Sequence, residues 1–264
     1  HLSALADRSS GMAALTPGAI MGHEFCGEVV EVGAHAPGQW HEGDRVCALP
    51  YISCGHCVDC VSGRGHRCRE VVYSGMGNLG GGYADYVTAP RHMALPIPDG
   101  VSMNVASMIS DMMGTPMGAT RRANIEAGET VAVWGLGPVG LGLVQGARIE
   151  GATTIVGVDL HANRRDLALE LGATHVVDPA TDDPAAAVRA LTGGRGADAV
   201  LHSVAAAGAS AQAFDALRME GRMVTVAGFP PAGGQMPKTV IGNWACYHAD
   251  FPEYIDLLTA GAFR

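Results

Sequence analysis

Apolar and polar positions follow different patterns in the two parts of the chain. Up to Gly100, short apolar stretches alternate with glycine and proline, and helical periodicity is poor. We expect strands there at Phe25–Val32, Asp44–Leu49 and Tyr83–Ala89. This part is therefore predicted to be an all-β unit, with a cysteine-containing lobe inserted at about residues 51–70.

The pattern changes after Ser102. Two helices are predicted at Met103–Ile109 and Met117–Asn124, with Asp111 and residues 114–116 in a turn between them. Beyond Gly128, apolar strands alternate with helices. The predicted strands are 130–134, 154–158, 175–177, 199–201 and 222–227, and the predicted helices are 138–150, 163–171, 184–191 and 209–218. This alternation predicts an α/β fold with a parallel, doubly wound sheet.

A glycine-rich turn follows the first of these strands and opens a helix. Its sequence is Gly135-Leu136-Gly137-Pro138-Val139-Gly140. In this context the glycines permit a tight turn, close approach of a pyrophosphate and close packing of helix on strand. The helix N-terminus also presents unpaired N–H groups to the phosphates. We therefore expect a dinucleotide to bind here.

The cofactor preference is predicted from the next strand end. Asp159 follows the strand 154–158, where a carboxylate accepts hydrogen bonds from both ribose hydroxyls of NAD and repels the 2′-phosphate of NADP. Arg164 could instead pair with a phosphate or contact the ribose. Asp159 could also be an ordinary helix cap. We expect NAD rather than NADP.

Four cysteines lie close together in the predicted lobe. They are Cys54, Cys57, Cys60 and Cys68. Such short spacings let the thiolates of one loop converge on one tetrahedral zinc ion, in a closed structural site. Disulfides or buried thiols are the alternatives, but disulfides need an oxidising compartment and the sequence shows no export signal.

Composition narrows the functional class. The chain has 264 residues, 48% of them hydrophobic and 16% charged, which is enough for one large or two ordinary buried cores. The formal net charge of −9 disfavours nucleic acid as a partner. Apolar runs are too short to cross a bilayer. We expect a cytoplasmic protein without a membrane partner.

A second metal site is suggested by Gly22-His23-Glu24, just before the first predicted strand. A histidine beside a carboxylate could supply a metal ligand. On spacing alone, however, a single histidine is more often a structural residue.

Several motifs occur together in one order: the Gly22-His23-Glu24 triplet, the turn Gly43–Val46, the four-cysteine lobe, the segment Gly81–Tyr86 and the glycine-rich turn. Together they resemble the zinc-dependent medium-chain alcohol dehydrogenases, including the threonine, polyol and secondary-alcohol branches. The resemblance implies a GroES-like catalytic domain at 1–109 and a Rossmann domain at 110–264 that binds NAD. It implies one structural and one catalytic zinc ion.

The resemblance also implies roles for single residues. His23 would be a catalytic zinc ligand, Glu24 a carboxylate that can approach the metal, and Asp111 the third ligand, a position that holds Cys in many relatives. Thr115 would line the nicotinamide pocket. The backbone that holds the carboxamide would be Ala227, Gly228 and Phe229.

The chain departs from the family pattern in two ways. The family's first catalytic ligand is a Cys in a Cys-Gly-Ser/Thr-Asp motif upstream of His23, and the chain lacks this motif. Cys26 is a poor substitute and is read as core; Cys47 and Cys246 are read as buried, unreactive thiols. We also expect the C-terminal return to the catalytic domain to be missing, so that the chain is truncated at both ends.

The predicted reaction is hydride transfer between an alcohol and NAD, in a homodimer or homotetramer with a small-molecule alcohol or carbonyl substrate. A zinc ion acts as Lewis acid on the alcohol oxygen. One alternative is a non-catalytic dinucleotide-binding protein with only the structural zinc. A zinc-free quinone or enoyl reductase would lack both the histidine–glutamate pair and the lobe. A zinc-ribbon nucleic-acid binder conflicts with the acidic charge.

Overall fold

The computed structural model describes residues 18–34, 36, 38–75, 80–206, 208–227, 238–244 and 246–264. It divides into two compact units. The first contains the described residues up to Gly114 together with residues 246–260, and the second contains Thr115–Trp244 and Gly261–Arg264.

This division differs from the predicted domains at both ends. The predicted boundary between residues 109 and 110 falls inside a helical segment that runs from Met103 to Arg122, and the first unit extends to Gly114 of this segment. The C-terminal segment was predicted to stay with the second domain, but residues 246–260 pack with the first. Their contacts include the hydroxyl of Tyr51, which donates to the carbonyl of Cys246 at 3.4 Å. Phe251 and Tyr254 of the same segment are buried.

The first unit contains a small antiparallel sheet of β1 (Phe25–Glu28), β2 (Arg45–Ala48) and β5 (Ala94–Pro96), in that order. The strands are shorter than predicted, and the predicted strand at Tyr83–Ala89 is wrong. Its tyrosines, Tyr83 and Tyr86, are largely exposed, so they supply no core face for a sheet.

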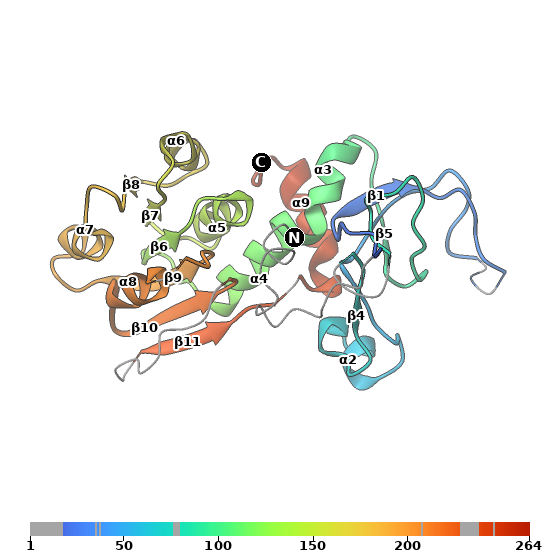
Figure 1. Ribbon diagram of the computed structural model, residues 1–264, viewed down its shortest axis with the longest axis horizontal. Helices are drawn as coiled ribbons and strands as arrows, with labels where there is room; N and C mark the ends of the chain where they lie inside the picture. The colour runs from blue at the N-terminus through green and yellow to red at the C-terminus, as the bar shows by residue number, and fades with distance from the viewer. Residues whose placement is uncertain are drawn as a thin grey trace. The chain divides into compact units, whose positions relative to one another are not determined.

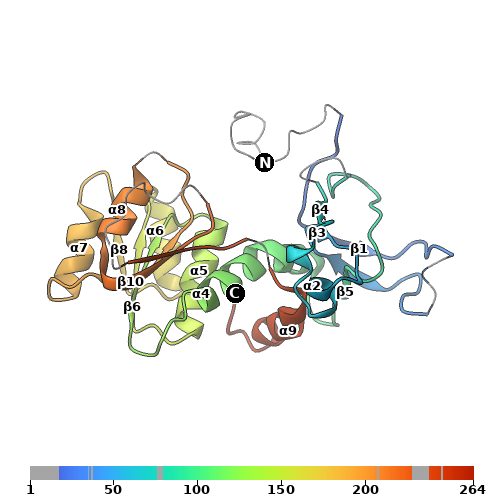
Figure 2. The same ribbon diagram turned by 90° about the horizontal axis from the view of Figure 1, so that it is seen from below.

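The cysteine lobe follows β2. It consists of β3 (Tyr51–Ile52), helix α2 (Val58–Val61), a 3₁₀ turn η1 (Gly65–Arg67) and β4 (Val72–Tyr73), with β3 and β4 paired antiparallel (Figure 2). Tyr51 is fully buried at the base of this lobe.

A helical segment follows β5, in three parts. Helix α3 (Met103–Met108) begins at Ser102, whose hydroxyl accepts a hydrogen bond from the N–H of Val105. A π-helical turn, η2 (Ile109–Met113), leads into α4 (Gly114–Arg122). The predicted turn at Asp111 and residues 114–116 is therefore wrong, because the wider π turn continues the helix through this point. The C-terminal segment adds η3 (His248–Asp250) and α9 (Phe251–Thr259).

The second unit is built on a parallel sheet, as predicted. Its described strands, in spatial order, are β11 (Thr239–Gly242), β10 (Leu217–Thr225), β9 (Ala197–His202), β6 (Thr130–Trp134), β7 (Thr154–Val158) and β8 (His175–Val177). From the adjacent central strands β6 and β9, the following strands of the chain are added outward in opposite directions, β7 and β8 on one side and β10 and β11 on the other. This is the doubly wound Rossmann order.

Helices cover both faces of this sheet (Figure 1). They are α5 (Pro138–Ile149), α6 (Ala162–Glu170), α7 (Pro184–Leu191) and α8 (Ala209–Asp215). Alternate residues of β6 serve the two faces: Val131 and Val133 pack with Leu143 of α5, whereas Ala132 and Trp134 pack in the cluster that contains α7 and α8 residues. Helix α8 ends before the predicted Arg218, because Leu217 already enters β10. Among the described helices, none is both long and apolar enough to cross a membrane.

Leu143 provides a test of this packing. Its side chain is 0% exposed in the core between α5 and the sheet, so Leu143→Ala should lower the free energy of unfolding by about 2–5 kcal/mol. Leu169 of α6 is 44% exposed, and Leu169→Ala should change it by no more than about 0.5 kcal/mol. Chemical denaturation of the two variants makes the comparison. Equal losses would show that the sheet face beneath α5 is not the core of this unit.

Candidate functional site

His23, Glu24 and Asp111 form one cluster in the first unit. The Nε2 atom of His23 lies 2.8 Å from Oδ2 of Asp111 and 3.8 Å from Oε1 of Glu24. One ligand atom from each residue lies within 4.8 Å of the others. All three side chains are partly buried. The structure therefore brings together the three residues that the resemblance implied for a catalytic metal.

The backbone before His23 is held by residues 81–83, which lead into the segment wrongly predicted as a strand. The N–H groups of Gly81, Gly82 and Tyr83 donate to the carbonyls of Ile20, Gly22 and Met21, at 2.8–2.9 Å. A side chain at position 81 would bring its Cβ within 2.3 Å of the carbonyl oxygen of Gly22. The two backbones can approach this closely only because both positions are glycine.

Asp111 reaches the cluster from the π-helical turn η2. A π turn inserts an extra residue into a helix and redirects the side chains around it, and such turns are frequent at functional sites. The sequence alone did not single out Asp111, because an aspartate between two predicted helices has the pattern of a cap.

The electrostatics of the cluster suit a cation. Burial, and next the negative charge of Asp111, raise the pKa of Glu24 above its usual value. Two half-buried carboxylates that repel each other beside an imidazole form an unfavourable arrangement unless a positive charge lies between them. Nitrogen and carboxylate oxygen are also donors that zinc accepts. His23, Glu24 and Asp111 therefore fit a zinc ion, although they are fewer than the four ligands of a closed site.

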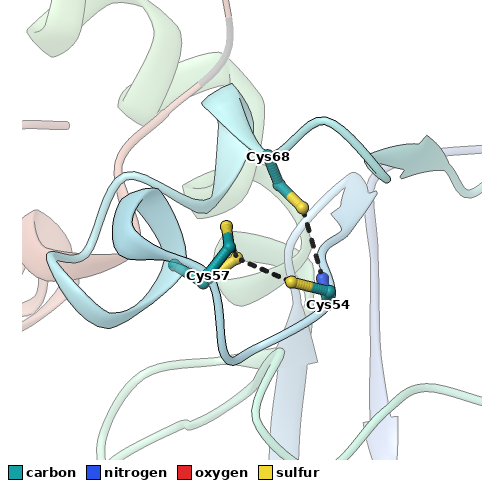
Figure 3. Close-up of side chains that lie close together, drawn as sticks. Cys54, Cys57 and Cys68 are labelled. Carbon is teal, nitrogen blue, oxygen red and sulfur yellow. Dashed lines mark hydrogen bonds between the residues drawn. The ribbon is translucent and has the colours of Figure 1, made fainter.

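The four lobe cysteines form the second cluster. Their Sγ atoms all lie within 4.8 Å of one another, with 3.4 Å between Cys57 and Cys60 and 3.8 Å between Cys54 and Cys60. Figure 3 shows the side chains of Cys54, Cys57 and Cys68 pointing toward one another. These distances exclude disulfides, whose sulfurs lie about 2.05 Å apart. They match the edge of a zinc tetrahedron, about 3.8 Å for Zn–S bonds of about 2.3 Å.

The surroundings favour a thiolate at Cys60. At Cys57 a backbone hydrogen bond at Cys60 lowers the pKa, but side-chain hydrogen bonds with Cys60 and Cys54 outweigh it and raise the pKa to about 11. Burial raises the pKa of Cys60, but hydrogen bonds from Ser53, Cys57 and neighbouring groups outweigh it and lower the pKa to about 6. The N–H groups of Cys54 and Glu70 both donate to Sγ of Cys68. Since zinc binds thiolates rather than thiols, the lobe fits the predicted metal.

The glycine-rich turn has the geometry of a nucleotide-binding loop in the second unit. Gly135 has φ +86°, and a Cβ there would meet the side chain of Val204 at 2.3 Å. A Cβ on Gly140 would lie 1.8 Å from the carbonyl oxygen of Gly135. A Cβ on Gly137, by contrast, would have no atom within 4 Å, so a phosphate can approach the backbone. Pro138 and Val139 then begin helix α5, as predicted.

Asp159 lies at the end of β7 and is buried. Its Oδ2 accepts a hydrogen bond from the N–H of Leu136, inside the glycine-rich turn, and its Oδ1 accepts one from the N–H of His161, both at 2.8 Å. Arg164 lies 3.5 Å from Oδ2 and is half exposed. The carboxylate therefore joins the turn to the start of α6, and it stands at the strand end where a ribose is expected.

The remaining predicted cofactor residues are less fully defined. Thr115 is buried in the second unit, and its carbonyl accepts a hydrogen bond from the side chain of Asn243. The carbonyl of Ala227 accepts hydrogen bonds from His202 and Thr225. Gly228 and Phe229 lie outside the described residues.

Two residues next to the nucleotide loop were given no role from the sequence. The hydroxyl of Ser203 donates to the carbonyls of Trp134 and Gly135, which lie 3.0–3.1 Å away, and so it stabilises the backbone of the turn. His202 is fully buried and donates from Nδ1 to Ala227, and burial lowers its pKa, which keeps the ring neutral. Their only sequence signal is their place at the end of β9.

The three other cysteines are free thiols. Burial raises the pKa of Cys26, Cys47 and Cys246, in the case of Cys47 to about 12, with a further contribution from Cys26. They are therefore thiols rather than thiolates at neutral pH.

Comparison with known families matches both units. Residues 5–99 match the alcohol dehydrogenase GroES-like domain, and residues 138–260 match the zinc-binding dehydrogenase family.

Individual relatives agree with these matches. The chain is 35% identical to L-threonine 3-dehydrogenase of Rhizobium rhizogenes over 81% of this chain and 61% of the relative, so it spans about three fifths of that protein's length. It is 31% identical to sorbitol dehydrogenase of Bacillus subtilis, over 92% of this chain and 70% of the relative. A Sinorhizobium meliloti structure, described as a zinc-binding dehydrogenase bound to NADP, superposes with a TM-score of 0.81 at 32% identity and covers 95% of this chain and 75% of that one.

Substitutions at two glycines of the turn can distinguish an effect on folding from an effect on cofactor binding. Gly140→Ala places a methyl group against the carbonyl of Gly135 and should lower the free energy of unfolding by about 2 kcal/mol. Gly137→Ala meets no protein atom within 4 Å, so stability should stay within about 0.5 kcal/mol while NAD affinity falls. Thermal unfolding and NAD titration of both variants provide the measurements. Undiminished NAD affinity in Gly137→Ala would place the pyrophosphate elsewhere.

Proposed function

The chain belongs to the zinc-dependent medium-chain alcohol dehydrogenase family, and we propose that it transfers a hydride between an alcohol and NAD, forming an aldehyde or a ketone. The observation that carries this proposal is the cluster of His23, Glu24 and Asp111, which converges on one point in a chain that also has a nucleotide-binding turn. Secondary alcohols and polyols are the proposed substrate class, because the relatives include threonine and sorbitol dehydrogenases.

Zinc would be held in the first unit by His23 and Asp111, with Glu24 close enough to exchange with another ligand. Bound there, it supplies a Lewis acid that lowers the pKa of an alcohol oxygen. His23 must present Nε2 as a neutral lone pair, and the neighbouring carboxylates supply negative charge that offsets the cation. His23, Asp111 and Glu24 are fewer than the four ligands of a closed site, so a zinc ion bound there would have a position for a substrate oxygen.

The lobe cysteines have a different role in the proposal. Four sulfurs from one short segment complete a tetrahedron, so no position is left for substrate. The second zinc ion is therefore structural: it holds together a lobe whose helix α2 is only one turn long and has no buried residue.

For the cofactor, we propose that Gly137 and the start of α5 contact the pyrophosphate and that Asp159 contacts the adenosine ribose. NAD accepts the hydride in this reaction. The buried carboxylate of Asp159 would repel a 2′-phosphate, which favours NAD over NADP. Arg164 lies within reach of the same position and could weaken that preference.

Thr115 and residues 227–229 are proposed to surround the nicotinamide, on the resemblance to the family. We further propose that the protein works in the cytoplasm as a homodimer or homotetramer. Its seven free cysteines suit a reducing compartment.

Zinc content tests the two metal sites separately. The two clusters predict two zinc ions per chain, so His23→Ala and Cys57→Ser should each retain one. His23→Ala should also lower alcohol turnover by about 100-fold or more while NAD affinity is unchanged. Cys57→Ser should lower thermal stability. Atomic absorption, NAD titration and NADH formation from a secondary alcohol are measured together.

The exposed histidine of position 41 is a matched control, and His41→Ala should keep both zinc ions and full turnover. If the parent chain binds one zinc ion, and His23→Ala leaves that number unchanged, the protein is a dinucleotide-binding protein with the structural zinc alone.

Asp159→Asn tests the cofactor preference. The N–H groups of Leu136 and His161 donate to different oxygens of Asp159, so the single amide oxygen of the variant can keep only one of these hydrogen bonds, and the negative charge is lost. NAD affinity should fall by about 10-fold, or about 1.4 kcal/mol, and NADP affinity should rise. Isothermal titration with each dinucleotide measures both. An unchanged ratio of the two affinities would remove Asp159 from cofactor selection.

A further inference from the structure

Cys26 and Cys47 lie directly opposite each other on neighbouring strands. Strands β1 and β2 are antiparallel, and their register pairs Cys26 with Cys47. Because opposed residues of an antiparallel pair have side chains on the same face, the side chains of Cys26 and Cys47 lie on one face of the sheet.

Hydrogen bonds at the end of the ladder show which type of pair this is. The N–H of Val29 donates to the carbonyl of Asp44 at 2.9 Å, so the hydrogen-bonded positions of β1 are the odd-numbered ones. Cys26 is therefore in a non-hydrogen-bonded pair, in which the Cα atoms are about 4.5 Å apart.

Hydrogen bonds between β2 and β5 independently show that Cys47 is in a non-hydrogen-bonded pair with Cys26. The N–H of Ile97 donates to the carbonyl of Arg45, and the N–H of Leu49 donates to the carbonyl of Met93. The odd-numbered residues of β2, including Cys47, therefore direct their backbone groups to β5 and not to β1. A Cα separation of about 4.5 Å lies within the 4.4–6.8 Å range of disulfides, at its short end.

The two cysteines differ in their exposure to solvent. Cys26 is half-buried, and its side chain lies on the face of the sheet opposite to that of Phe25 and Val46. Its Sγ lies 3.1 Å from the carbonyl of Met103. Cys47 is 0% exposed. Because Cys26 is only partly buried, a small oxidant can reach it more readily than it can reach Cys47.

We propose that Cys26 and Cys47 are a redox-active pair, which a peroxide converts to a cross-strand disulfide. The sulfur of Cys26 attacks one peroxide oxygen, the O–O bond breaks, and water leaves with a sulfenic acid formed on Cys26. The sulfur of Cys47 then displaces the sulfenic oxygen as a second water. The two thiols lose two hydrogens and two electrons, and the peroxide is reduced to two waters.

Two properties of this bond follow from its position. The Cβ atoms of opposed residues lie about 4.5–5.5 Å apart, and those of non-hydrogen-bonded pairs lie at the short end of this range. This is still more than the mean of about 3.8 Å in disulfides, so the strands must draw together. A strained disulfide is readily reduced, and a dithiol should reverse the reaction. The bond would also join the strand that follows Glu24 to the strand that leads into the cysteine lobe.

Peptide mapping tests the proposal on the full, zinc-loaded chain. The protein is treated with hydrogen peroxide, its remaining thiols are alkylated, and peptides are mapped without reduction. Cleavage after Tyr51 separates Cys47 from the lobe cysteines. We expect a peptide that joins Cys26 to Cys47, a loss of two of the seven alkylatable thiols, and full recovery with dithiothreitol. Oxidation should be slow, since Cys47 is 0% exposed and Cys26 is half-buried.

Single-cysteine variants test which cysteines form the cross-link. Cys47→Ser should lose the cross-link and leave Cys26 as a sulfenic or sulfinic acid, whereas the matched control Cys246→Ser should keep the cross-link. The proposal is overturned if Cys26 and Cys47 remain thiols while lobe cysteines oxidise, or if Cys26 joins a lobe cysteine. A bond between Cys47 and Cys246 also overturns it. The measurement on the parent chain decides between these outcomes even if a variant does not fold.

Discussion

The candidate metal cluster depends on one contact, between His23 and Asp111, two residues 88 positions apart that approach to 2.8 Å. Everything that positions this contact is backbone geometry. Paired glycines let the segment around Gly81 lie against the residues that precede His23, and a π turn directs Asp111 toward the same point. Without either constraint, an imidazole and a carboxylate would each be ordinary surface residues.

Close backbone approach is also what shapes the nucleotide-binding turn. Gly140 lies so near the carbonyl of Gly135 that no side chain fits, while Gly137 faces open space. Asp159 and Ser203 then hold the turn through its amide and carbonyl groups. In both units, therefore, glycine allows the backbone itself to form the wall of a site.

The cysteines show how geometry decides the chemistry of one residue type. In the lobe, short spacings and a one-turn helix bring four sulfurs within 4.8 Å of one another, at distances that suit a metal and exclude disulfides. In the sheet, strand register sets Cys26 opposite Cys47, at a backbone separation that suits a disulfide. Cys246, buried on the returning C-terminal segment, has neither arrangement in its favour.

Local patterns in the sequence determined what depends on neighbouring residues: the bounds of β6, β7, β8 and α7, the glycine-rich turn and the converging cysteine lobe. Tertiary structure alone decided what depends on distant ones. It continued the helix through Asp111, left Tyr83–Ala89 without a strand, returned residues 246–260 to the first unit and paired Cys26 with Cys47. Periodicity indicates which face of an element is buried, but not which distant segment of the chain will pack against it. All four of these features depend on such distant segments.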